Sequence, residues 1–143
     1  MKAALTHQLT ADIPAQYPSS ETTVPAGFPS PAQDYTATSI DLNHILIKDK
    51  TATYILRVSG HSMIDAGISD GGEIIVDRSI TPTHGNIVVA ALAGEFTVKR
   101  FEIDHHGKGW LVPANPDYSP IPSEEEADFL IFGVVTRCIH HVY

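Results

Sequence analysis

Short runs of apolar and β-branched residues, separated by glycine-containing turns, cover most of the chain after residue 53. Such runs predict strands, and they are found at residues 54–58, 73–77, 87–92, 95–103, 110–112 and 128–139. Only Ala93 and Gly94 separate the third and fourth runs, so a hairpin is expected there. Helical periodicity is not sustained anywhere, and Asp41–His44 alone is expected to form a short helical turn. The pattern predicts a mainly β domain.

The first 31 residues have a different character. Periodic apolar spacing is absent, and five of the ten prolines fall here: Pro14, Pro18, Pro25, Pro29 and Pro31. Proline fixes the backbone and removes a donor, so regular helix or sheet is not expected in this segment. The sequence therefore predicts a flexible N-terminal arm over 1–31 and a β-rich domain over 32–143.

Composition narrows the class of protein. A chain of 143 residues suits one globular domain, and its net charge of −8 without a run of Lys or Arg disfavours direct nucleic-acid binding. Cys138 is the sole cysteine, which excludes an intramolecular disulfide and fits a reducing compartment; its apolar surroundings favour a core residue. The sequence shows no apolar region of signal-peptide length, and the longest apolar run, 129–135, is too short to span a membrane. A cytoplasmic protein without membrane association is expected.

Candidate chemistry begins where the predicted strand at 54–58 breaks at Ser59 and Gly60. Ser62 follows this break, and a serine at a strand end after a flexible glycine is well placed to act as a nucleophile. It requires a base, because a free serine is barely nucleophilic at neutral pH. His61 is a poor candidate for that base, since neighbouring side chains of an extended chain point to opposite sides.

Lys99, in the predicted strand 95–103, is the other candidate base. A lysine acts as a base only when neutral, and lowering its pKa from about 10.4 toward 7 needs about 4–5 kcal/mol of bias against the charged form. Burial supplies such a bias. Alternation places Lys99 on the same strand face as Thr97 and Phe101, a partly apolar face. The strand pattern alone favours a surface lysine, because lysines are seldom buried.

Two motifs carry a resemblance to a known family: Ser-Gly-His-Ser-Met at 59–63 and Thr-Val-Lys-Arg at 97–100. Together with Pro-Ala-Gly-Phe-Pro at 25–29 and Ile-Asp-Leu-Asn at 40–43, they resemble the UmuD-type self-cleaving Ser-Lys peptidases of the LexA/UmuD family, peptidase S24. The resemblance covers nearly the whole chain from Pro25 onward. It implies a compact, highly twisted, multi-stranded LexA-like fold with an extended N-terminal arm.

The resemblance also implies residue roles. Ser62 aligns with the nucleophile and Lys99 with the general base, and the backbone N–H groups of His61 and Ser62 are the expected oxyanion hole. The implied substrate is the chain's own Ala26–Gly27 bond, which has Ala-Gly as in the LexA branch where the UmuD type has Cys-Gly. Val24 would fill an apolar pocket.

Biological expectations follow from the same resemblance. They are a role in SOS mutagenesis, a homodimer, cleavage stimulated by the RecA filament on single-stranded DNA, and a trimmed form that serves a Y-family translesion DNA polymerase as accessory subunit. No cofactor is expected. The eight histidines are expected at surface or turn positions rather than in a metal site, since the pairs His105–His106 and His140–His141 are adjacent and lack the spacing of a helix-borne zinc pair.

Two other functions fit parts of the sequence. A signal-peptidase-like enzyme acting in trans would also pair Ser-Met with a lysine, but no membrane anchor is visible and Asp65 stands where that family usually has proline. A non-cleaving β interaction domain with an inactive site is the third possibility, and an activity test separates it from the first.

Overall fold

The computed structural model describes residues 1–8, 16–20, 27, 37–122 and 129–142. The chain divides into two compact units. The first contains Met1–Thr10 and Asp49–Tyr143, and the second contains Ala11–Lys48.

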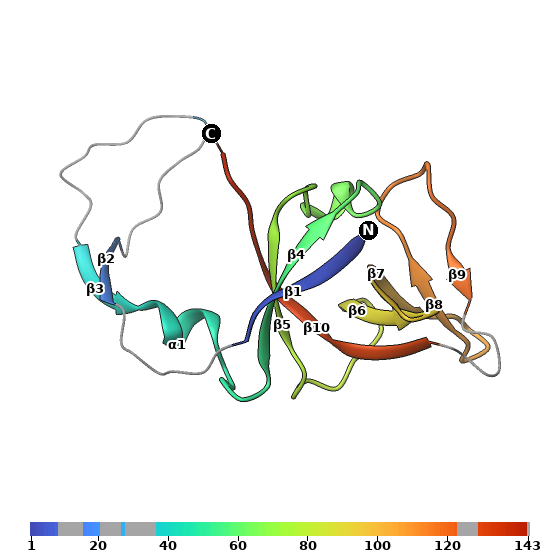
Figure 1. Ribbon diagram of the computed structural model, residues 1–143, viewed down its shortest axis with the longest axis horizontal. Coiled ribbons are helices and arrows are strands. Elements are labelled where there is room, and N and C mark those ends of the chain that lie inside the picture. Colours follow the sequence, from blue (N-terminus) through green and yellow to red (C-terminus); the bar gives the residue numbers. More distant parts are fainter. Residues whose placement is uncertain (9–15, 21–26, 28–36, 123–128, 143) are drawn as a thin grey trace. The chain divides into compact units, whose positions relative to one another are not determined.

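The first unit is built on one eight-stranded sheet (Figure 1), whose strands follow the order β1-β4-β5-β10-β6-β7-β8-β9. An additional pairing of β1 with β7 closes this sheet on itself. The strands are β1 Lys2–Gln8, β4 Thr53–Ser59, β5 Glu73–Asp77, β6 Ile87–Leu92, β7 Glu95–Ile103, β8 Gly109–Val112, β9 Ile121–Pro122 and β10 Phe129–Ile139. Within the described residues every pairing in this sheet is antiparallel. The expected mainly β, compact LexA-like fold is confirmed.

The predicted strands correspond closely to the observed ones. The bounds of β5, β6 and β7 agree with the prediction residue for residue, and β4 and β8 extend theirs by one residue or two. Ala93 and Gly94 form the expected β6–β7 turn with φ of 50° and 80°, as a two-residue hairpin turn of the primed type requires. Residue 128, the expected start of the last strand, lies outside the described residues.

The expectation of no regular strand within residues 1–31 was wrong. Lys2–Gln8 forms β1, which pairs with β4, and Gln16–Ser20 forms β2. Pairing with a strand distant in the sequence, from Lys2 with Ser59 to Gln8 with Tyr54, stabilises β1, and no local pattern reveals such a partner. The division of the chain at residue 31 stays a prediction.

The second unit contains β2 paired antiparallel with β3, Ala37–Asp41, followed by α1, Leu42–Leu46. Asp41 caps this helix, since its carboxylate accepts a hydrogen bond from Asn43 N at 2.9 Å. The expected helical turn at Asp41–His44 is therefore present. No described helix is long and apolar enough to cross a membrane.

The core of the first unit lies between β4, β5, β6 and β7. Its largest cluster of buried apolar residues consists of Met1, Leu56, Val58, Met63, Ile68, Ile74, Val76, Val89 and Val98. Burial of these side chains supplies the main stabilisation of the fold. Met63 belongs to this cluster and directly follows Ser62, so the core packs against the candidate site.

Candidate active site

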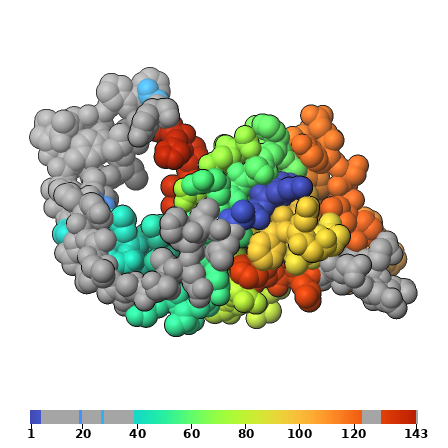
Figure 2. Space-filling view, viewed as in Figure 1, coloured from blue at the N-terminus to red at the C-terminus, as the bar shows by residue number. Residues whose placement is uncertain are grey.

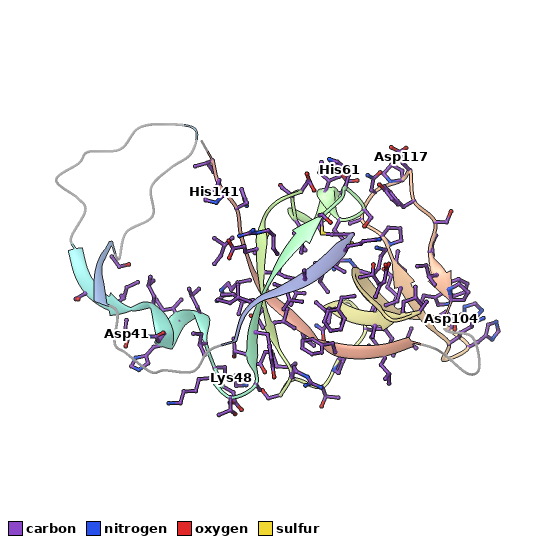
Figure 3. All side chains as sticks on the ribbon, viewed as in Figure 1. Asp41, Lys48, His61, Asp104, Asp117 and His141 are labelled. Carbon is purple, nitrogen blue, oxygen red and sulfur yellow. The ribbon has the colours of Figure 1, made fainter. Side chains whose placement is uncertain are left out.

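The loop after β4 places Ser62 in the interior of the first unit. Gly60 turns the chain with φ of 96°, a conformation that favours glycine, and its N–H donates to Asp70 Oδ1 at 2.7 Å. The chain then enters a short 3-10 turn, Ile64–Ala66. Ser62 is fully buried, whereas the neighbouring His61 is exposed and labelled in Figure 3. This is the opposed orientation expected for the two side chains.

A second loop, which follows β8, fixes the backbone around Ser62. Ala114 N donates to the Ser62 carbonyl at 2.7 Å, and Asp65 N donates to the Ala114 carbonyl at 2.9 Å. Asn115 Nδ2 donates to the His61 carbonyl at 2.9 Å. Nothing in the sequence marked Asn115 as a residue of the site, because it lies more than fifty positions after His61, in a proline-rich loop.

These contacts matter for the expected oxyanion hole. In the described part of the chain, the hydrogen bonds of this loop use the carbonyl groups of His61 and Ser62, and none uses their N–H groups. The fixed His61 carbonyl holds in one orientation the peptide plane that also carries the Ser62 N–H, one of the two expected donors. Preorganised donors of this kind are what a developing oxyanion requires.

Lys99 meets Ser62 inside the protein. Its Nζ lies 3.0 Å from Ser62 Oγ, 3.1 Å from Thr97 Oγ1 and 3.0 Å from the Val98 carbonyl. The side chain is 5% exposed, so the surface alternative for Lys99 is wrong. Burial lowers the pKa of Lys99 from its usual value of 10.5, because desolvation disfavours the charged form. Thr97 shares the face of β7 with Lys99, as alternation predicts, although its contact with Nζ was not anticipated.

Met1 is the unexpected residue of the site. Its terminal nitrogen lies 2.5 Å from Ser62 Oγ, and its carbonyl accepts hydrogen bonds from Val98 N and Thr97 Oγ1, both at 2.9 Å. Burial, followed by the effects of Lys99, lowers the pKa of the terminal amine to about 5. The expected chemistry of Ser62 and Lys99 therefore lies beneath the first residues of β1.

The expected cut site is only partly described. Gly27 is exposed, and the Cβ of an alanine at this position would have no neighbour within 4 Å. Ala26 and Val24 lie outside the described residues. The position of this bond relative to Ser62 therefore stays a prediction.

The other candidate residues from the sequence, Cys138 and the paired histidines, make no described contact with Ser62 or Lys99. Cys138 is half-buried against the core, and burial raises the pKa of its thiol, as suits a small apolar residue. The described histidines of the two adjacent pairs are exposed, and His105 stacks on His106 at a centroid distance of 3.9 Å. Among the described residues, no three His, Cys, Asp or Glu side chains are grouped so that they could hold a metal ion.

Comparison with known proteins gives the same family. The family model described as "Peptidase S24-like" matches residues 18–136. The chain is 44% identical to Protein ImpA of Salmonella typhimurium over 115 residues, which cover 80% of this chain and 77% of that protein. It is 45% identical to Protein SamA of Salmonella typhimurium, over 81% of this chain and 79% of SamA. The LexA repressor of Acidithiobacillus ferrooxidans is 45% identical over 78% of this chain but only 55% of its own length. This chain belongs to the peptidase S24-like family, the family of the LexA and UmuD-type proteins that its serine and lysine motifs resemble.

Proposed function

We propose that this protein is a serine endopeptidase that cuts its own Ala26–Gly27 bond, with Ser62 as nucleophile and Lys99 as general base. One observation carries the proposal: Lys99 Nζ and Ser62 Oγ lie 3.0 Å apart, and both side chains are buried. Hydrogen-bond contact is the geometry that a nucleophile and its base need. Burial favours the neutral amine that a base must be.

In the first half of the reaction, neutral Lys99 accepts the Ser62 hydroxyl proton while Oγ attacks the Ala26 carbonyl carbon. The carbonyl oxygen becomes an oxyanion, which the N–H groups of His61 and Ser62 stabilise. The Lys99 ammonium then gives its proton to the Gly27 nitrogen, and the C–N bond breaks. The products are a free Gly27 amine and an ester that joins Ala26 to Ser62.

In the second half, Lys99 is neutral again and takes a proton from a water molecule that attacks the ester. The tetrahedral intermediate uses the same oxyanion hole. Its collapse breaks the ester bond, and Ser62 Oγ recovers a proton from Lys99. Ala26 leaves as a carboxylic acid, which loses its proton to the solvent, and the two residues return to their starting protonation states. The cycle needs no cofactor.

Two features of the sequence favour the Ala26–Gly27 bond as substrate. Small side chains on both sides of a bond let the backbone approach a buried serine closely, and Gly27 is exposed in its unit. Val24, two residues before the bond, suits an apolar pocket. Proline at 25 and 29 disfavours regular helix, which suits a segment that must bind as an extended strand.

The biological role that fits best is SOS mutagenesis. Family membership and the relatives ImpA and SamA support a UmuD-type protein whose trimmed form, starting at Gly27, serves as accessory subunit of a Y-family translesion DNA polymerase. We propose a homodimer and activation by the RecA filament on single-stranded DNA. Such an activator adds no catalytic group; it stabilises the bound position of the cut-site segment over its other positions.

Mass spectrometry of the purified protein, followed over time at mildly alkaline pH, tests the proposal. The expected product begins Gly27-Phe28-Pro29 and appears in wild-type protein but not in the Ser62→Ala variant. A different new N-terminus would disprove the cut site, and equal cleavage of the Ser62→Ala variant would disprove the mechanism. Adding RecA, an ATP analogue and single-stranded DNA should accelerate the same cut at neutral pH. The proposed homodimer is tested separately: sedimentation of the Ser62→Ala protein should show a dimer at micromolar concentration.

A further inference from the structure

The first residues of β1 occupy the space where a substrate carbonyl must lie. Figure 2 shows Met1–Ala4, in blue, lying on the face between the green strand region and the yellow region of β6 and β7. The Met1 nitrogen is 2.5 Å from Ser62 Oγ, and attack on a peptide bond requires the carbonyl carbon within about 3–3.5 Å of the same oxygen. Two chain segments cannot fill that space at once.

Met1 is held there as an extended peptide would be. Its carbonyl accepts the Val98 N–H of β7, and its side chain is 9% exposed within the apolar cluster that also contains Val58 and Met63. Ala3 packs against the same cluster, whereas Lys2 and Ala4 are exposed. Buried and exposed side chains thus alternate from Met1 to Ala4, as they do in an extended peptide bound at the edge of a sheet. In such complexes backbone hydrogen bonds supply affinity, and pockets receive every second side chain.

We propose that β1 is an inhibitory strand that competes with the Ala26 segment for the groove over Ser62. Resting on the self-cleavage proposed above, this inference adds its regulation: β1 must leave before cleavage, and the population of the open groove sets the rate. Cleavage after Ala26 would then also separate β1 covalently from the rest of its sheet. The trimmed product would keep the groove open for an extended segment.

The way β1 is bound makes its departure feasible. It pairs with β4 along its length, but it pairs with β7 only at Lys2 and Thr97. Beside its first residues, a pocket of about 680 Å³ is lined by residues 2–4, 57–59, 70–71 and 94–96. The ion pair between Lys2 Nζ and Glu95 Oε2, 3.3 Å long, is exposed, so its contribution is small. One side of β1 is thus held by few contacts.

A matched pair of substitutions in the full chain tests the proposal. Ala3→Asp introduces a carboxylate that must be buried for β1 to bind, whereas Ala4→Asp adds the same charge on the exposed face of the same strand. We expect Ala3→Asp to accelerate self-cleavage about tenfold or more at neutral pH, since the open fraction rises, and Ala4→Asp to stay near wild type. A synthetic peptide with the sequence of residues 1–8 should slow the Ala3→Asp variant again, and a scrambled peptide should not.

A charge swap supplies a second test should Ala3→Asp lower the melting temperature. Lys2→Glu and Glu95→Lys should each accelerate cleavage about two- to fivefold, and the double variant should return toward the wild-type rate. Lys48→Glu makes the same charge change in the second unit and should have no effect. Equal rates for all of these folded variants would overturn the inhibitory role of β1, as would slower cleavage in folded Ala3→Asp.

Amide exchange separates this inference from the proposed function. The Val98 N–H donates to the Met1 carbonyl, so its exchange in the Ser62→Ala protein reports the departure of β1 without any cleavage. Faster Val98 exchange with Ala3→Asp, but not with Ala4→Asp, is the expected result. Absence of cleavage in every Ser62-containing form would refute the peptidase alone. Normal cleavage with unchanged rates and unchanged exchange would refute the inhibitory strand alone.

Discussion

Thr97 Oγ1 lies 3.1 Å from Lys99 Nζ and donates its only hydrogen to the Met1 carbonyl, 2.9 Å away. The hydroxyl can therefore only accept from Lys99 while β1 is bound. An N–H of Lys99 is directed at Thr97, and the lone pair of the neutral amine is left for the Ser62 hydroxyl. Thr97 thus orients the amine as a positioning residue.

Replacement of Thr97 tests that role. Once β1 has left, the Thr97 hydroxyl can still accept from Lys99 Nζ, and this is the hydrogen bond that matters for catalysis. Thr97→Val keeps the side-chain shape and removes that acceptor. We therefore expect self-cleavage about 5- to 50-fold slower in the Ala3→Asp background, where the lost bond to the Met1 carbonyl cannot itself affect the rate. Losing an acceptor for the ammonium should also shift the midpoint of the pH–rate profile downward. Thr97→Ser should restore both rate and midpoint. Identical behaviour of the valine and serine variants would exclude the positioning role.

Substitution of the two central residues should abolish self-cleavage. Ser62→Ala and Lys99→Ala are each expected to reduce the rate by about 10³-fold or more, and the double variant should be hardly slower than either, because the two residues act as a unit. Lys99→Arg is the informative control, since a guanidinium stays charged and cannot act as a base. Substantial cleavage by Lys99→Arg, measured by mass spectrometry, would exclude lysine as the base.

The rate should depend on pH through Lys99. Burial lowers its pKa below 10.5, so the neutral fraction at a given pH is larger than for an exposed lysine. We expect the self-cleavage rate to rise about tenfold per pH unit at first and to level off before 10.5. Folded protein must be verified by circular dichroism at each pH. A flat rate between pH 7 and 10 would contradict this assignment.

The local pattern of apolar residues and turns was sufficient to predict many of the strands. Glycine-containing turns precede β5, β6 and β7, and the apolar runs themselves mark where these strands end, so their limits agree with the prediction. The two-residue spacing between Thr97 and Lys99 likewise placed both side chains on one face. Family motifs then indicated Ser62 and Lys99, which lie 37 positions apart in the sequence and meet where the loop after β4 contacts β7.

The pairing of β1 with β4 and β7 could not be predicted from the sequence. Ala3 and Ala4 have weak strand propensity, and β1 exists because β4 and β7 offer it backbone partners that are distant in the sequence, from Gln8 with Tyr54 to Lys2 with Thr97. The prolines that follow made the whole segment look irregular. The burial of Lys99 also depends on tertiary packing, so no strand pattern could distinguish it from a surface lysine.

Gly133 is predicted to be essential for the packing of β10. A Cβ at this position would lie 2.7 Å from Val76 Cγ1 and 3.2 Å from the Asp77 carbonyl, so the neighbouring strand would have to shift. Gly133→Ala in the Ser62→Ala background should destabilise the protein by about 1–3 kcal/mol in chemical denaturation. Gly27→Ala, which meets nothing within 4 Å, is the matched control and should leave stability within about 0.5 kcal/mol. Equal stability of the two variants would contradict the close packing.

The buried amine should also make stability depend on pH in a defined direction. Because the folded-state pKa of Lys99 is lower than its unfolded value of 10.5, the unfolded chain binds more protons between the two values. The contribution of Lys99 to stability therefore rises with pH through that window; it is complete above 10.5 and lost below the folded-state pKa. Lys99→Met, which removes the titrating group while keeping similar volume, should raise the melting temperature of the Ser62→Ala protein at pH 7. The difference between the two proteins should narrow as pH approaches 10.5. A difference that stays constant from pH 7 to 10, or one that widens, would show that Lys99 does not carry the depressed pKa on which its role as a base depends.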